Sequence, residues 1–238
     1  MSRQFNPADP EWMDRPQPVS AELLSDLRNL RALNRYFGSH RLIRYFLRRW
    51  IREDDQLRIL DLATGSGDIP RLLVEFARDV GAKVQVDAVD FQASTIEIAR
   101  QLSSGFPEIR YHCADIHSFG DAQSYDIVLF SLALHHFSEE DAVSLLRRCD
   151  GLSRGNVLVS DLCRTWFARA GVDLLTVTIF RQEMTRNDAR ASVARAFSFA
   201  ELERLARAAG WEDFGHRRFR FARQAIWLER GAFDRDPG

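Results

Sequence analysis

From residue 57 onward, short apolar segments alternate with amphipathic segments, and this alternation constrains the fold more than any other feature. The expected strands cover residues 58–62, 83–90, 109–113, 126–131 and 156–161, and helical patterns separate them at 69–79, 93–103 and 139–152. Parallel neighbouring strands require a crossover connection, which is usually a helix. The order therefore predicts an α/β fold, a Rossmann-like doubly wound sheet whose strands are mostly parallel.

The C-terminal third extends this sheet. The pattern Ser198-x-x-Glu201 is a capping box that opens a helix over 199–209, and Gly210 closes that helix. Residues 211–217 and 219–228 then resemble two strands joined by a short turn. We expect this pair to give the sheet seven strands and an antiparallel C-terminal member.

The remaining segments flank or interrupt this pattern. Residues 1–56 are expected to form a proline-bearing leader and a helical lid, with helices beginning after Ser20 and after Gly38. Residues 57–230 are expected to form the Rossmann-like domain. Within it, residues 162–197 break the alternation and are interpreted as a substrate-cap insertion.

Composition limits the functional classes. The net charge is −1, so no global field attracts the protein to nucleic acid. The three cysteines are far apart, which favours reduced thiols over a disulfide framework. The N-terminal residues lack the apolar core of a signal peptide, and no apolar run is long enough to span a membrane. We therefore expect a cytoplasmic protein, of an oligomeric state that the sequence leaves open.

A glycine-bearing turn follows the first expected strand. Asp61 lies at the end of that strand, and Gly65-Ser66-Gly67 precedes the next helix. Glycine permits a ligand to approach the backbone, and the free N–H groups at a helix N-terminus favour a negatively charged ligand group. A plain tight turn is the alternative. Asp90 and Asp115 end the next two strands, where one carboxylate can bind a ribose and the other an adenine edge.

The chain carries the motifs DLATGSGD, AVDF, CADI and LFSLALHHF in this order. Over residues 57–228 it resembles the class I S-adenosylmethionine-dependent methyltransferases, and within them the methyltransferase type 11/12-like group. The turn is similar to that of ubiquinone/menaquinone-type methyltransferases, whereas the N-terminal helices and residues 162–197 match that subgroup less well. The resemblance implies S-adenosyl-L-methionine as cofactor and S-adenosyl-L-homocysteine (SAH) as product. The implied cofactor-binding residues are Asp61, Ala63, Thr64, Gly65, Gly67, Asp90, Phe91, Asp115, Ile116, Ser131 and Leu132.

The resemblance also implies roles for these residues. Asp61 and the glycines would surround the methionine part of the cofactor, and Asp90 would hold the ribose. Phe91, Asp115 and Ile116 would contact the adenine, and Ser131 and Leu132 would pass near the sulfonium. The superfamily often has glycine where this chain has Ala63, and alanine is acceptable there if its φ angle is negative.

A dinucleotide-binding oxidoreductase would share the turn and the ribose acid. Such a protein is expected to carry G-x-G-x-x-G, but here the third glycine position is Pro70. An NAD-dependent oxidoreductase and a non-catalytic cofactor-binding regulator of the same fold remain the alternatives.

His135 and His136 lie at the mouth of the expected site. Either histidine could act as a general base near neutral pH, and the alternative is that both bind only the surrounding loop. A metal site is not expected, because adjacent side chains diverge and a structural zinc site needs four ligands.

Four further residues are candidates for contact with the methyl acceptor: Tyr36, Asp161, Arg164 and Trp166. Asp161 could instead cap a helix, and Arg164 could be a surface charge. The N-terminal helices and residues 162–197 also contain the aromatic residues Phe37, Tyr45, Phe46, Trp50, Phe167, Phe180 and Phe197, together with Met184. These residues either pack the helices on the sheet or line a pocket for an apolar acceptor. We expect O- or C-methylation of a small aromatic or hydrophobic molecule, such as a phenol, quinol or polyketide.

Arginines recur on one face of the second N-terminal helix: Arg41, Arg44, Arg48 and Arg52. Such a face is usually solvated or paired with acids. It could also contact an anionic membrane surface peripherally. Binding of RNA by the same arginines is disfavoured by the balanced net charge.

Overall fold

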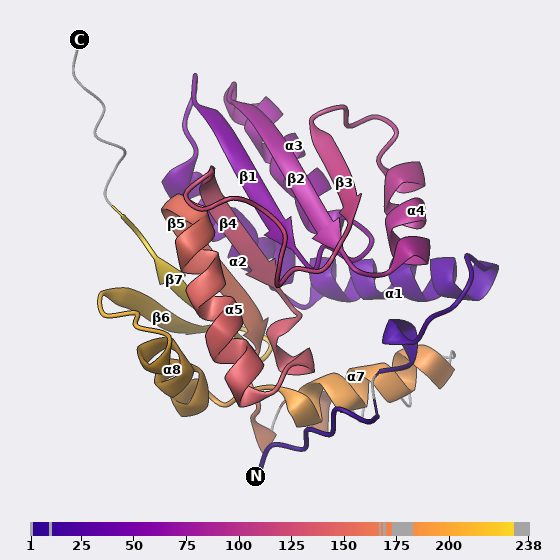
Figure 1. Cartoon of the computed structure of the whole chain (residues 1–238). Coiled ribbons are helices and arrows are strands. Elements are labelled where there is room, and N and C mark those ends of the chain that lie inside the picture. The colour runs from indigo at the N-terminus through magenta and orange to yellow at the C-terminus, as the bar shows by residue number, and fades with distance from the viewer. Residues whose placement is uncertain (1, 10, 167, 169, 173–182, 231–238) are drawn as a thin grey trace.

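The computed structural model describes residues 2–9, 11–166, 168, 170–172 and 183–230. Its sheet has seven strands in the order β3-β2-β1-β4-β5-β7-β6, and Figure 1 shows their twist. The strands are β1 (Gln56–Leu62), β2 (Lys83–Asp90), β3 (Ile109–Cys113), β4 (Tyr125–Ser131), β5 (Ser153–Leu162), β6 (Phe214–Phe219) and β7 (Arg223–Leu228). Strands β3, β2, β1, β4 and β5 are parallel, and β7 is antiparallel to β5. The predicted fold class is confirmed.

Helices cover both faces of this sheet. They are α1 (Ala21–Tyr36), α2 (Ser39–Trp50), α3 (Asp68–Val80), α4 (Ala93–Leu102), α5 (Glu139–Leu152), α7 (Glu183–Arg195) and α8 (Phe199–Ala208), with 3-10 turns η1 (Trp12–Asp14) and η2 (Leu134–His136). One large apolar core contains buried residues of α2 and α3, and a second contains buried residues of α5 and α8. A small third cluster joins α1 to α4. The central strands are apolar because both of their faces are covered, as is usual in parallel sheets.

Two predicted boundaries in the C-terminal pair of strands are wrong by several residues. Trp211 lies just after α8 and is bonded back to the helices rather than to the sheet, because its N–H donates to Ala206 O and its indole Nε1 donates to Leu146 O. Phe221 and Ala222 have φ angles of 58° and 50°, so they form the turn and β7 begins only at Arg223. The predicted capping box of Ser198 and Glu201 is present at the start of α8.

The carboxyl ends of the central strands meet at one edge of the sheet. The register pairs Leu62 of β1 with Val89 of β2 and with Phe130 of β4, so these strands end almost level. Helices α1 and α7 cross this edge, and the N-terminal residues lie beside α7 (Figure 1). Ligands usually bind at this edge in doubly wound sheets.

Residues 2–9 and 11–20, here called the N-terminal strap, are fastened across the same edge. Arg3 donates to the carbonyl oxygens of His135, Phe137 and Arg195, and Trp12 N–H donates to Asp188 Oδ1 at 2.9 Å. The chain that was expected to be an irregular leader therefore covers the predicted site. Among the described residues, no helix is long and apolar enough to cross a membrane.

Candidate functional site

A cavity of about 700 Å³ lies at the carboxyl edge of the strands. Most of the residues that were predicted to bind the cofactor, and both candidate general bases, line this cavity. They are Asp61, Ala63, Thr64, Gly65, Asp90, Phe91, Asp115, Ile116, Ser131, Leu132, His135 and His136. They come from the ends of β1, β2 and β4, from the segment after β3, and from η2. The structure thus brings together side chains that are up to 75 positions apart in the sequence.

The two glycines of the turn have different surroundings. Gly65 lines the cavity with φ +55°, and a Cβ built on it meets nothing within 4 Å, so its backbone faces open space. Gly67 has φ +73°, and a Cβ there would lie 2.0 Å from the hydroxyl oxygen of Tyr111. Gly67 does not line the cavity; it lets β3 and the start of α3 approach each other closely. Tyr111 was not singled out from the sequence.

A Gly67→Ala variant is expected to lose about 2–4 kcal/mol of unfolding free energy, because the left-handed backbone and the clash with Tyr111 both add strain. A Tyr111→Ala exchange in the same chain should recover part of that loss. Urea unfolding of the two single variants and the double variant measures this coupling. Strict additivity of the two changes would contradict a direct clash.

Ala63 departs from the expectation made for it. Its φ angle is +54°, so the condition of a negative φ is not met. Leu132, at the end of β4, also has a positive φ of 57°, and its N–H donates to Ser160 O at 2.8 Å. Non-glycine residues rarely adopt this conformation, and such strain concentrates at functional sites. Both residues line the cavity, so the sheet edge holds strained backbone beside the ligand space.

The strand-end acids are held by backbone N–H groups. Asp90 Oδ2 accepts from Gly65 N at 2.9 Å and Asp90 Oδ1 accepts from Gln92 N at 3.0 Å, so the acid also fixes the glycine turn. Burial raises the pKa of Asp90. Asp115 is exposed on the cavity wall, and its Oδ1 accepts from His117 N at 2.9 Å.

Asp61 is buried, and its Oδ2 atom has no hydrogen-bond partner among the described residues. Burial, with a smaller contribution from the neighbouring carboxylates Asp68 and Asp90, raises the pKa of Asp61 to about 7. An unpartnered buried carboxylate oxygen is costly unless a ligand binds it. Its position beside Gly65 suits a cationic group such as an ammonium.

Among the other residues of the cavity wall, His135 is held by Asp161. His135 Nδ1 lies 2.7 Å from Asp161 Oδ1, and His135 N donates to Asp161 Oδ2 at 2.9 Å. Both side chains are buried. Asp161, one of the predicted acceptor contacts, therefore reaches the cavity through the imidazole rather than by lining it.

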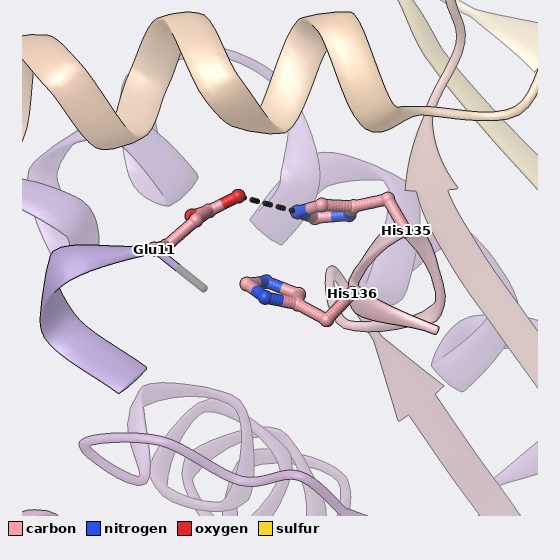
Figure 2. A group of neighbouring side chains, drawn as sticks. All are labelled: Glu11, His135 and His136. Atoms are coloured by element: carbon pink, nitrogen blue, oxygen red, sulfur yellow. Dashed lines mark ion pairs between the residues drawn. The ribbon is translucent and has the colours of Figure 1, made fainter. Parts of the chain in front are cut away.

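His136 is paired with the N-terminal strap. Its Nδ1 lies 2.7 Å from Asp14 Oδ2. Burial alone would lower the pKa of His136, but Glu11 and Asp14 outweigh it and raise this pKa to about 9. The His135 and His136 rings lie side by side with centroids 4.3 Å apart, so the premise that their side chains diverge is wrong (Figure 2).

The other three predicted acceptor contacts do not line the cavity either. Tyr36 and Trp166 are exposed, while Arg164 is buried and donates to Ala196 O and to Glu201 Oε1 at the start of α8. Of the expected aromatic residues, Phe46, Trp50 and Phe197 pack in the interior, and Phe167 and Phe180 lie outside the described residues. The apolar lining comes instead from Leu27, Leu30, Leu33, Ile69, Phe91, Phe137, Leu162, Val172 and Val193.

Sequence reasoning missed several polar residues of the cavity. Arg31 and Asn34 reach it from α1, and Glu11 and Asp14 reach it from the strap. For α1, the leucine spacing was the signal that could have identified the face toward the cavity. The strap has no such periodicity, so its sequence gave no signal for Glu11 and Asp14. On α2, Arg41 and Arg48 are exposed and Arg44 is half-buried, and Arg52, which follows the helix, is exposed.

Comparison with known proteins finds similarity to methyltransferases. Residues 59–156 match the family model described as a methyltransferase domain. The chain is 37% identical over 75 residues to the 2-phytyl-1,4-naphtoquinone methyltransferase of Thermosynechococcus vestitus. The aligned segment covers 32% of each protein. It is 34% identical over 113 residues to the ubiquinone biosynthesis O-methyltransferase of Bradyrhizobium sp. This aligned segment covers 46% of the chain and 42% of the relative. The matches therefore span well under half of either relative's length.

The fold has a solved counterpart in the plantazolicin methyltransferase BpumL in complex with SAH. The TM-score is 0.63 at 14% sequence identity, over 88% of this chain and 91% of that one. This likeness concerns the fold, and the family match concerns the segment from β1 into β5 that carries the glycine turn and the strand-end acids. Residues 59–156 therefore match a methyltransferase domain, and the chain has the fold of a solved methyltransferase.

Proposed function

We propose that this protein transfers the methyl group of S-adenosylmethionine to a small, largely apolar acceptor that carries an ionisable hydroxyl. The observation that carries the proposal is the buried His135–Asp161 pair, which shares one cavity with the glycine turn. The two quinone-pathway relatives support the same acceptor class, because a quinol carries such hydroxyls.

The residues at the turn end of the cavity fit the cofactor. The open space over Gly65 leaves room for a ligand against the backbone, and the unpartnered Asp61 Oδ2 suits the ammonium of its methionine part. Asp90 would hold the ribose, and Asp115 and Ile116 would meet the adenine. When bound, S-adenosylmethionine supplies an electrophilic methyl group. The protein has to align the acceptor with it and remove the acceptor's proton.

His135 is suited to receive that proton. Burial alone would raise the pKa of Asp161, but the charge and hydrogen bond of His135 outweigh this effect and lower it, so the carboxylate is ionised. When the imidazole is neutral, an ionised Asp161 keeps its proton on Nδ1, which leaves the lone pair on Nε2. That Nε2 atom makes no hydrogen bond within the described part of the chain, and the ring lines the cavity. An acceptor hydroxyl would supply the missing donor.

The walls favour a small acceptor. Leucines of α1, Ile69 of α3 and Val193 of α7 contribute aliphatic surface, and the strap covers the same edge. A cavity of about 700 Å³ lies within the range of small-molecule sites. The cavity has to hold the adenosyl cofactor and the acceptor at the same time. A polymer could therefore insert only one protruding group into it.

Calorimetry with SAH and with NADH tests the cofactor assignment, and labelled methyl transfer to a panel of phenols, quinols and polyketides tests the acceptor class. We expect SAH to bind and NADH not to bind. Binding of NADH alone would contradict the proposal. Normal SAH binding without transfer to any panel member would favour a non-catalytic regulator.

Asp61 predicts a pH dependence of cofactor affinity. Because its pKa is raised to about 7, the carboxyl of the free protein is largely protonated below that pH, and a bound ammonium favours the ionised form. Affinity for SAH should rise by up to about tenfold per pH unit from about pH 6 towards pH 7, and level off above it. Calorimetry across this range, with Asp61→Asn as control, measures the effect. Parallel profiles for the two proteins would contradict it.

The same carboxyl links pH to the stability of the free protein. A raised pKa means that the folded state holds a proton which the unfolded state has released, so stability is lost as pH rises from about 4 through about 7. The loss is bounded at about 4 kcal/mol, and Asp61→Asn should not show it.

A further inference from the structure

We propose that Glu11, His135 and His136 form a binding site for a divalent transition-metal ion at the acceptor end of the cavity. One possible ligand atom from each of the three residues lies within 4.8 Å of the other two. Figure 2 shows the Glu11 carboxylate, from the strap, facing the two imidazole rings of η2. All three residues line the cavity.

The donor set matches the chemistry of such ions. Two imidazoles and one carboxylate bind zinc or ferrous iron in sites that keep positions open for water or substrate. Only three protein ligands are needed there, so the requirement of four ligands for a closed structural site does not apply. Glu11 and His135 are each 2% exposed, so the donors lie inside the molecule and not on its surface.

Each imidazole is already oriented by a second carboxylate. His135 Nδ1 is 2.7 Å from Asp161 and His136 Nδ1 is 2.7 Å from Asp14, so Nε2 is the donor atom of each ring once an ion has displaced any proton on it. In metal sites the ligating histidine usually donates its other ring N–H to a carboxylate or a carbonyl, and this contact fixes the tautomer and the ring orientation. The cluster therefore contains both the ligands and their supporting groups.

The present contacts leave room for an ion. His135 Nε2 is buried and without a hydrogen-bond partner among the described residues, and the nearest Glu11 oxygen is 3.9 Å away, too far for a hydrogen bond. Ligands of a tetrahedral ion with bonds of about 2.1 Å are about 3.4 Å apart, so the donors must approach by less than about 1.5 Å. Glu11 is anchored by Ser192 Oγ at 2.9 Å and lies 3.6 Å from Arg195.

This inference does not rest on the proposed methyl transfer. An ion would use the Nε2 lone pair of His135, so an acceptor oxygen in the loaded protein would meet the ion, as a Lewis acid, in place of the imidazole. It would also connect the strap to η2 directly. Glu11, His135 and His136 are distinct from the residues assigned to the cofactor, so variants that lose the ion should still bind SAH.

Titration of the chelator-treated full chain with Co²⁺ tests the site, since bound Co²⁺ shows visible ligand-field absorption and replaces Zn²⁺ at sites of this type. We expect one ion per chain and a rise in melting temperature with Zn²⁺. Glu11→Gln and His136→Gln should each weaken Co²⁺ binding at least about tenfold, and Asp161→Asn about 10–100-fold. Glu75→Gln on α3 and His112→Gln on β3, both outside the cavity, are the matched controls.

Calorimetry with SAH on the same variants shows that each is folded and keeps the two hypotheses apart. Loss of Co²⁺ binding in Glu11→Gln and His136→Gln with unchanged SAH affinity is the expected result. The proposal is overturned if wild type gives no stoichiometric Co²⁺ spectrum, or if the controls weaken binding as much as the site variants. If SAH fails to bind while Co²⁺ binds, the proposed function fails and the metal site stands.

Discussion

Asp90→Ala is expected to weaken SAH binding by about 100-fold or more. The carboxylate accepts from Gly65 N and Gln92 N, so its loss releases the glycine turn as well as the ribose contact. Each hydrogen bond to a charged group contributes about 1.5–3 kcal/mol, and about 1.4 kcal/mol corresponds to a tenfold change in affinity. Two such losses at the same site account for the expected effect.

Calorimetry measures this change, and Asp87→Ala is the matched control. Asp87 lies on the same strand and bonds His112 and Tyr125, but it does not line the cavity. Its loss should lower stability and leave SAH affinity within about threefold of wild type, because its hydrogen bonds lie outside the cavity. If Asp90→Ala bound SAH as tightly as wild type, the assignment of Asp90 to the ribose would be wrong.

Much of the fold could be predicted because its signals are local. The apolar strands and the helices between them can be recognised within windows of about a dozen residues, and helix crossovers leave little choice but a parallel sheet. The errors in β6 and β7 have another origin. Trp211 and Phe221 have strand-like side chains. Trp211 nevertheless follows α8 and bonds back to it, and Phe221 occupies a turn with positive φ, so only tertiary contacts decide between these states.

The turn end of the candidate site was predictable for the same reason. Asp61, Gly65 and Asp90 mark strand ends and a turn, and the topology alone places strand ends together. The conformation of Ala63 was not predictable, because its φ of +54° is imposed by the turn around it rather than by its own preference.

The acceptor end depends on contacts between distant segments. Glu11 and Asp14 come from a proline-bearing segment without periodicity and meet histidines more than 120 positions later. No local pattern encodes that pairing. Asp161 shows the same limit, since the sequence left it as an acceptor contact or a cap, whereas the structure makes it the partner of His135.

Asp161→Asn is expected to reduce turnover of a hydroxyl acceptor by about 10²–10⁴-fold while SAH affinity stays within about threefold. The amide keeps the shape of the carboxylate but can donate a hydrogen bond to His135 Nδ1. The imidazole proton then moves to Nε2, and the lone pair that should receive the acceptor's proton is lost. The control is Asp126→Asn, because Asp126 is a buried carboxylate that accepts from Arg58 N and Arg154 outside the cavity.

A pH profile separates this role from a purely structural one. A phenol ionises by itself near pH 10, so an acceptor of that class needs progressively less help as pH rises. The deficit of Asp161→Asn should therefore shrink towards high pH, measured as initial rates in chelator-containing buffer that keeps Nε2 free of metal. A structural defect would lower the rate by the same factor at every pH. That constant deficit, or equal rates for Asp161→Asn and wild type, would remove His135 from the reaction.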